Sequence, residues 1–177
     1  SIDQKESPHE PQSLQEQNFL QMLETHQGIL QKVCRVYTRS ESDFGDLHQE
    51  MILQLWKSFP RFKGEAKVST WIYRIALNTA ISGLRKQERQ KVENTDPVTL
   101  PDEGFVDEQH EAKERKSFLY QAIAQLSDIE KAIIMLYLEE QPYDEIAKIM
   151  GLTRNHVGVK INRIKQKLKT LLQDHLQ

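Results

Sequence analysis

The sequence predicts an all-α protein with two helical domains joined by an acidic flexible linker. Apolar residues recur at three- and four-residue intervals through most of the chain, and no segment alternates strongly enough to indicate a strand. The stretch 94–104 breaks this pattern with Pro97, Pro101 and turn-forming residues. We therefore divide the chain into a polar tail at 1–13, a first domain at 14–91, a linker at 92–116 and a second domain at 117–177.

The first domain begins with a periodic segment between Leu14 and Thr38, which predicts an amphipathic helix or a pair of helices broken near Gly28. A second helix is expected to start after Asp46 as its N-cap and to end before Pro60. A loop over 61–69 and a third helix over 70–90 follow. The apolar residues expected to be buried by the second helix are Leu47, Ile52, Leu55, Trp56 and Phe59.

The second domain should contain helices at about 108–126, 127–139, 143–150 and 154–175. Ser127 and Glu130 form a capping box at the start of the second of these. The last two have the spacing of a helix-turn-helix, with a small Ala147 at the crossing and Gly151 in the turn. Thr153 is the expected cap of the final helix.

The final helix has an apolar stripe opposite a polar face. Val157, Ile161, Ile164 and Leu168 follow steps of four, three and four residues, so we expect them to be buried together. Amide and guanidinium groups on the free face can donate hydrogen bonds to base edges in the major groove, while flanking cations meet phosphates. The alternative is an ordinary solvated face. The candidate DNA-binding residues are Arg154, Asn155, His156, Val159, Lys160, Asn162, Arg163 and Lys167.

The third helix of the first domain carries a basic stripe. Arg74, Asn78, Arg85 and Arg89 are four, seven and four residues apart and share a face with Trp71 and Ser82. Cationic and amide groups beside an aromatic ring suit unpaired or distorted DNA. A core position is the competing interpretation for the aromatic residues Trp56, Trp71 and Tyr73.

Composition narrows the possible functions. The net charge of −2 divides into +4 over 12–91, −5 over 92–116 and +1 over 117–177, so two basic blocks flank an acidic strip. Cys34 is the only cysteine and should be a buried thiol. The sequence has no phosphate loop, no metal-ligand spacing and no recognisable nucleophile, so we expect no enzyme, no cofactor and no metal. No signal peptide or membrane span is evident, which favours a cytoplasmic protein.

The first domain contains three motifs, which read Asp46-Leu47-His48-Gln49-Glu50 with Trp56, Phe62-Lys63-Gly64-Glu65, and Thr70-Trp71-Ile72-Tyr73-Arg74-Ile75-Ala76-Leu77-Asn78. The second domain contains one more, which runs from Leu126 to Leu168. The first three resemble region two, and the last is similar to region four, of the extracytoplasmic function family of bacterial RNA polymerase sigma factors.

This resemblance implies the partners of each segment. The segment from Asp46 to Trp56 would dock on the beta-prime coiled coil of core RNA polymerase, through Asp46, Gln49, Glu50 and Gln54. The loop 62–69, with Lys63, and Asn78 would hold a flipped base of the minus-ten element.

Region four would read the minus-thirty-five element and meet the beta flap, and an anti-sigma factor is a possible further partner. The acidic linker would pass toward the polymerase cleft, or would be a plain solvated tether. Gly158 and Ser82 depart from residues common in relatives, so promoter specificity cannot be copied from them. A two-domain DNA-binding regulator is the main alternative, although a sensor domain would not need the basic stripe.

Overall fold

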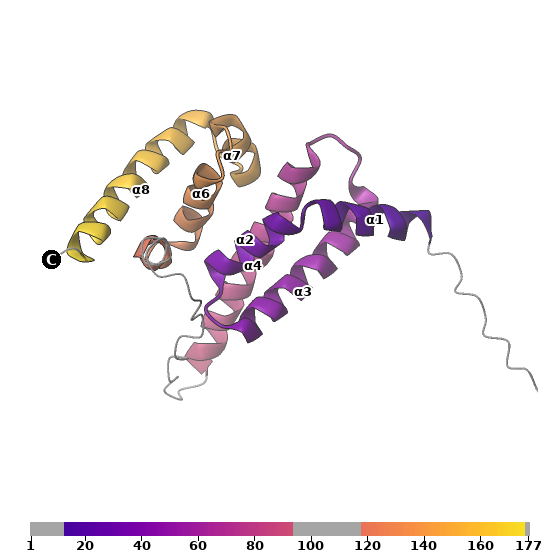
Figure 1. The fold of residues 1–177 in the computed structure, drawn as a ribbon, viewed down its shortest axis with the longest axis horizontal. Coiled ribbons are helices and arrows are strands. Elements are labelled where there is room, and N and C mark those ends of the chain that lie inside the picture. Colours follow the sequence, from indigo (N-terminus) through magenta and orange to yellow (C-terminus); the bar gives the residue numbers. More distant parts are fainter. Residues whose placement is uncertain (1–12, 94–117, 176–177) are drawn as a thin grey trace, which may run out of the picture.

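The computed structural model describes residues 13–93 and 118–175, so residues 94–116 of the expected linker and 1–12 of the expected N-terminal tail lie outside the described residues. Within those two ranges all regular structure is helical, which confirms the predicted all-α class. Figure 1 shows two groups of helices side by side. The first group is α1 (Leu14–Thr25), α2 (Gln27–Tyr37), α3 (Glu41–Ser58) and α4 (Val68–Glu93). The second group is the helical stretch 118–124 with α6 (Asp128–Leu138), α7 (Tyr143–Met150) and α8 (Arg154–His175).

The first periodic segment is a pair of helices, but the predicted position of the break was wrong. α1 ends at His26, whose backbone N–H bonds to the carbonyls of Met22 and Leu23, whereas Gly28 lies inside α2. The His26 ring also bonds the Met22 carbonyl at 3.0 Å, so the side chain adds to the cap. A glycine lowers helix propensity by only about 1 kcal/mol, which is too little to place a break by itself.

The start of α3 was also predicted wrongly. Ser40 is the N-cap, and its hydroxyl accepts a hydrogen bond from the Asp43 amide at 3.1 Å. Asp46 therefore lies within α3 and is exposed. Five additional helical residues precede Asp46 because Ser40 is an equally good cap placed one and a half turns earlier.

The core of the first group lies between α2, α3 and α4. Leu30, Val33, Met51, Leu55 and Ile72 are almost fully buried there. Cys34 is buried as predicted, with its thiol 3.8 Å from the Met51 sulfur. Burial disfavours the thiolate and raises the pKa of Cys34 to about 11.

Trp56 was expected in this core but is 36% exposed, because it lies on the outer side of α3 against Phe19 of α1. Leu47, Ile52 and Phe59 are only half-buried, so of the five expected apolar residues of α3 only Leu55 is fully buried. Among the other aromatic residues, Tyr73 is a core residue and Trp71 is half-buried.

The second group matches its prediction closely. The Ser127 hydroxyl and the Glu130 carboxylate make the reciprocal capping box at the start of α6. α7 and α8 have the predicted bounds, and Gly151 takes the left-handed conformation (φ 67°) that ends α7. The portion of the first predicted helix before residue 118 lies outside the described residues.

The two groups are in direct contact: α7 and α6 pack against α4, and α8 lies on the outer side of the second group (Figure 1). The packing of α7 on α4 determines which residues of the basic stripe are accessible.

Candidate functional site

The first component of the site is α8. Its predicted stripe of Val157, Ile161, Ile164 and Leu168 is buried at 7% exposure or less. The opposite face is exposed for Arg154, Asn155, His156, Val159, Asn162, Arg163 and Lys167, and Lys160 is half-buried. The stripe therefore fixes α8 in rotation, so that its amide and guanidinium groups point away from the protein.

The turn before α8 holds its N-terminus in place. The Thr153 hydroxyl accepts a hydrogen bond from the His156 amide at 3.2 Å, as predicted for an N-cap. The Leu152 amide bonds the Ala147 carbonyl at 3.0 Å, so the turn is closed by the backbone. A recognition helix needs such a fixed start, because its first turns enter the groove.

Two of the cations at the edge of this face have partners within the domain. Lys167 Nζ lies 2.7 Å from Glu130 Oε2, and Arg154 Nε lies 3.8 Å from Asp144 Oδ1. Although partial burial acts to raise it, the pKa of Glu130 is lowered overall by hydrogen bonds from Lys167 and Ser127. The side chain of Lys167 is therefore held toward α6 by the Glu130 carboxylate.

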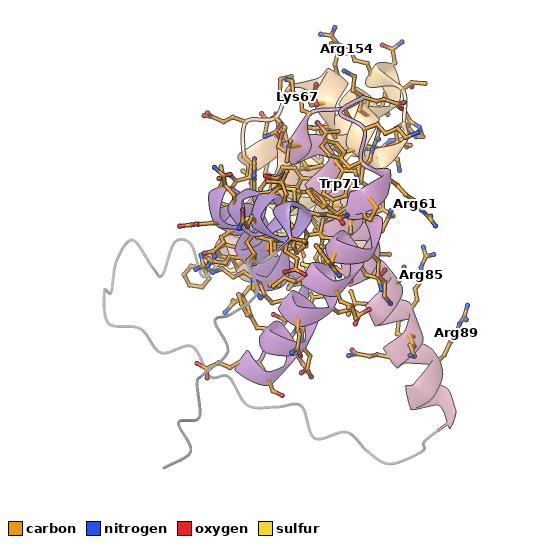
Figure 2. All side chains as sticks on the ribbon, turned by 90° about the vertical axis from the view of Figure 1, so that its right-hand side faces the viewer. Arg61, Lys67, Trp71, Arg85, Arg89 and Arg154 are labelled. Carbon is orange, nitrogen blue, oxygen red and sulfur yellow. The ribbon has the colours of Figure 1, made fainter. Side chains whose placement is uncertain are left out.

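The second component is the exposed side of α4. Asn78, Ser82, Arg85 and Arg89 are all exposed along this helix, as the spacing predicted. Figure 2 shows Arg61, Arg85 and Arg89 projecting from the same edge of the molecule. Arg61 was missed by the sequence analysis, because it lies in the 3-10 turn Phe59–Arg61 and belongs to no helical period.

The aromatic part of this surface is a small cluster. The Trp71 ring lies 4.8 Å from the Phe62 ring and 6.4 Å from the Phe59 ring, measured between centroids. Trp71 is half-buried by this packing. It is therefore partly a core residue, and the remainder of its side chain is accessible as part of the basic stripe. The loop after α3 thus holds Trp71 in one orientation.

Lys63 and Asn78 occupy different parts of the surface. Lys63 is exposed in the loop that precedes α4, whereas ten residues of helix, about 15 Å, separate the start of α4 from Asn78. Asn78 lines a groove between α3 and α4 together with Gln54, Ser82 and Lys86. The structure therefore separates the loop and Asn78 into two contact points on one face.

The third component is a groove of about 490 Å³ between α1 and α3. Asp46, Gln49 and Glu50, three of the proposed docking residues, line it. The sequence analysis missed the apolar lining of this groove, because the periodicity of α3 alone cannot show that Phe19 of α1 packs against Trp56 of α3. This lining consists of Phe19, Ile52, Leu53 and Trp56.

Gln54, the fourth proposed docking residue, lies away from this groove. Its amide donates to Glu50 Oε1 at 2.8 Å, and it lines the other groove beside Asn78. Glu50 borders both grooves.

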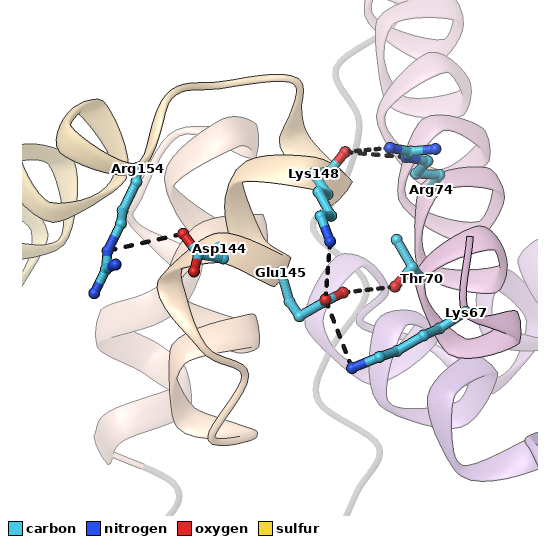
Figure 3. Close-up of polar contacts among 7 residues, drawn as sticks. All are labelled: Lys67, Thr70, Arg74, Asp144, Glu145, Lys148 and Arg154. Atoms are coloured by element: carbon cyan, nitrogen blue, oxygen red, sulfur yellow. Dashed lines mark hydrogen bonds and ion pairs between the residues drawn. The ribbon is translucent and has the colours of Figure 1, made fainter. Parts of the chain in front are cut away.

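Arg74, a member of the α4 stripe, is bound to the other domain. Its guanidinium donates two hydrogen bonds to the Lys148 carbonyl of α7, at 3.0 and 2.8 Å (Figure 3). Beside it, the Thr70 hydroxyl donates to Glu145 Oε2 at 2.8 Å. Single-domain motifs could not predict these contacts, because they join residues that are 74 and 75 positions apart in the sequence.

Within residues 13–93 and 118–175, no cluster of three or more His, Cys, Asp or Glu side chains could hold a metal ion. None of the helices in that part of the chain is long and apolar enough to cross a membrane.

These features define a class: a helical protein with one helix-turn-helix and a second basic helical surface next to an aromatic cluster. Comparison with known families gives a match to Sigma-70 region 2 over residues 22–90 and to Sigma-70 region 4 over residues 119–168. The ECF RNA polymerase sigma-E factor of Haemophilus influenzae is 31% identical over 155 residues, covering 80% of this chain and 82% of that protein. The chain therefore belongs to the ECF family of RNA polymerase sigma factors, which serve promoter-specific transcription initiation.

Other similar proteins agree on family and fold. The ECF RNA polymerase sigma factor SigW of Bacillus subtilis is 24% identical over 172 residues, which cover 88% of this chain and 89% of SigW. The sigma factor RpoE of Bartonella quintana, solved in complex with the anti-sigma factor NepR, superposes with a TM-score of 0.70 at 21% identity, over 89% of this chain and 96% of that one. CnrH, solved with the cytosolic domain of CnrY, gives a TM-score of 0.66 at 19% identity, over 90% of each chain. At these identities the two structures bear on the fold alone.

Proposed function

We propose that this chain is a non-catalytic sigma subunit that reads a minus-ten element with residues 14–91 (region two) and a minus-thirty-five element with residues 117–177 (region four). The observation that carries the proposal is the presence, in one chain, of two exposed basic helical faces of different kinds. The α8 face is a continuous polar surface on a capped helix, which suits the major groove of paired DNA. The α4 face combines arginines with an aromatic cluster, which suits unpaired bases and their phosphates.

In region two, the spacing of the contact points supports a role in holding a separated strand. About 15 Å of helix lies between the loop of Lys63 and Asn78, which is the span of about four stacked nucleotides at 3.4 Å each. The Asn78 amide offers both a donor and an acceptor to an extruded base. Trp71, Arg85 and Arg89 would stack on bases or neutralise the strand along the same face.

The α1–α3 groove is the proposed docking site for the beta-prime coiled coil of core RNA polymerase. An apolar floor with Trp56 and Leu53, bordered by Asp46, Gln49 and Glu50, has the composition of a binding hot spot with a polar rim. The acidic rim favours a basic partner helix. The beta flap would meet region four. An anti-sigma factor is a candidate regulator, because both solved neighbours are complexes with another protein, which for RpoE of Bartonella quintana is the anti-sigma factor NepR. A protein that works with RNA polymerase in this way would act in the cytoplasm.

Transcription with added core RNA polymerase on genomic promoter fragments, with start sites mapped, tests the proposal. We expect start sites that depend on this chain and share two elements. Glu50→Lys should lower co-purification with core polymerase about tenfold, because it reverses a charge on the groove rim. Glu24→Lys makes the same charge change on the exposed surface of α1, outside the groove lining, and should leave co-purification unchanged. Equal co-purification of both variants would exclude this groove as the docking site.

A further inference from the structure

The candidate DNA-binding face of α8 has an apolar side chain at its centre. Val159 is 47% exposed, whereas the other seven candidate residues of this face are polar or charged. The buried residues Val157 and Ile161 stand two positions before and after it, each at 0% exposure. Two residues correspond to about 200° of helical rotation, so Val159 points almost directly away from the buried stripe. α8 therefore cannot turn Val159 inward without exposing both of these core residues.

The packing of region four does not explain an apolar residue at this position. In the described part of the chain, Val159 is not among the partly buried hydrophobic residues that pack against the core. Valine is also a poorer helix former than lysine, glutamine or glutamate, because its branched side chain loses rotamer freedom in a helix. An exposed valine that the fold does not need points to a ligand with an apolar surface.

Val159 lies among side chains suited to base edges. Asn155 is four residues before it, and Asn162 and Arg163 are three and four residues after it, so all three are its neighbours on the helix surface. These three side chains are exposed. An asparagine amide can bond adenine through two hydrogen bonds, and an arginine can bond guanine in the same way. The apolar side chain is thus placed within the row of groups that would meet the bases.

The helical rise relates these positions to neighbouring base pairs. Three or four residues of α-helix rise about 4.5 to 6 Å, which is about one to two base pairs at 3.4 Å each. A helix lying along the major groove would therefore place Asn155 and Asn162 on either side of the base pair that Val159 meets. The group that Val159 contacts then lies inside the element and not at its edge.

We propose that Val159 reads the 5-methyl group of a pyrimidine in the minus-thirty-five element, between the bases that Asn155 and Asn162 meet. The inference rests on the proposed function and names the base chemistry that this site selects. The methyl group of thymine is the apolar group that a base edge presents in the major groove, where the other groups are hydrogen-bond donors and acceptors. Valine cannot pair with those groups, so covering them would leave them without partners. In unmodified DNA the base pair that Val159 meets therefore carries a thymine, and 5-methylcytosine presents the same methyl group.

Replacement of thymine by deoxyuridine tests this contact, because it removes the methyl group and keeps the hydrogen-bonding groups of the base. The chain assembled with core RNA polymerase is bound to promoter duplexes in which each thymine of the minus-thirty-five element is replaced in turn. We expect one replacement to weaken binding by the wild-type chain about fourfold, the value of one buried methyl group. Val159→Ala should bind the thymine duplex and that deoxyuridine duplex equally, since the partner of the methyl group is then absent.

Leu138→Ala is the matched control, because Leu138 is an apolar side chain of region four that is 48% exposed and lies on α6. It should keep the full deoxyuridine effect. A duplex with cytosine at the sensitive position should bind more weakly than the thymine duplex. Its 5-methylcytosine form should recover about fourfold with the wild-type chain and nothing with Val159→Ala. It should still bind less tightly than thymine, because the other groups of the base pair differ.

Circular dichroism shows whether each variant keeps its helices. The proposal would be overturned by the absence of a deoxyuridine effect at every thymine, by an equal effect with Val159→Ala, or by loss of the effect with Leu138→Ala. A minus-thirty-five element built only from G·C pairs would overturn it as well. Failure of the proposed function looks different: start sites mapped with core polymerase would then not depend on the chain, or would share no minus-thirty-five element.

Discussion

Region two and region four each present a candidate DNA-binding helix of amphipathic design, yet the surroundings of the two helices differ. α8 has one clean buried stripe and an exposed polar face, and its turn is fixed by Thr153 and Gly151. α4 is packed on α2, α3 and α7, and its candidate face is shared with an aromatic cluster and a contact to the other domain. A helix that reads intact duplex needs only to protrude, whereas a surface that receives a separated strand has to be assembled from several elements.

The largest effect is expected from a substitution in the buried stripe of α8. Ile161→Ala removes a fully buried side chain and should destabilise region four by about 2–5 kcal/mol. Val159→Ala, at a 47% exposed position of the same helix, should change stability by less than about 0.5 kcal/mol. Urea unfolding followed by circular dichroism measures both, and similar losses would contradict the separation of a buried and a free face.

The next test separates base readout from phosphate binding on α8. Arg163→Ala should cost about 1–3 kcal/mol on promoters with an intact minus-thirty-five element and little on mutated ones. Lys167→Ala should weaken binding to all sequences alike and lower the salt slope by about 1. Competition binding of the polymerase complex over a salt series distinguishes them. Equal discrimination between matched and mutated elements by wild type and Arg163→Ala would remove Arg163 from base readout.

A smaller effect is expected from Asn78→Ala, which should leave closed-complex binding nearly intact and lower strand opening by about 0.5–1.5 kcal/mol, the value of a hydrogen bond. A template already mismatched at the minus-ten element should restore much of the loss, because the unpairing cost is then removed. Permanganate footprinting of unpaired thymines on both templates measures this. Normal opening on fully paired DNA would show that Asn78 does not serve strand separation.

The smallest effect concerns pH and the contact between the regions. The pKa of Glu145 is lowered in the folded chain, so its ionised form stabilises the α4–α7 contact above its ordinary value of 4.5. This stabilisation should be lost as the pH falls through the lowered pKa. Distances between spin labels on α3 and α8, measured from pH 7 down to well below pH 4.5, should lengthen at the acid end in wild type, and Glu145→Gln should already show the longer distances at pH 7. A wild-type distance independent of pH would show that the Glu145 charge does not hold the regions together.

Much of the fold could be predicted because local signals agreed. The capping box at Ser127, the turn at Gly151 and the stripe around Ile161 each depend on residues within a few positions of one another. The errors in region two have a common physical cause. Ser40 and Asp46 are both acceptable caps, and His26 ends α1 through backbone and ring contacts that composition does not show.

The parts of the candidate site that could not be predicted from the sequence all depend on contacts between residues far apart in the chain. The apolar floor of the α1–α3 groove needs Phe19 beside Trp56, and their ring centroids lie 4.9 Å apart. The hydrogen bonds from Arg74 to the Lys148 carbonyl require α7 to lie beside α4. Periodicity identifies which side of a helix is polar, but only tertiary packing decides what that side touches.

Gly158, one of the two departures from common family residues, has an evolutionary consequence. A Cβ atom built there would lie 3.6 Å from the Tyr143 ring, an ordinary packing distance, so the position points toward α7 and tolerates a larger side chain. Replacing a helical glycine by alanine raises helix stability by about 1 kcal/mol. α8 thus holds a stability reserve at a position apart from the residues of its candidate DNA-binding face. Such a reserve would let a lineage accept a costly change of promoter specificity on one side of α8 and compensate for it on the other.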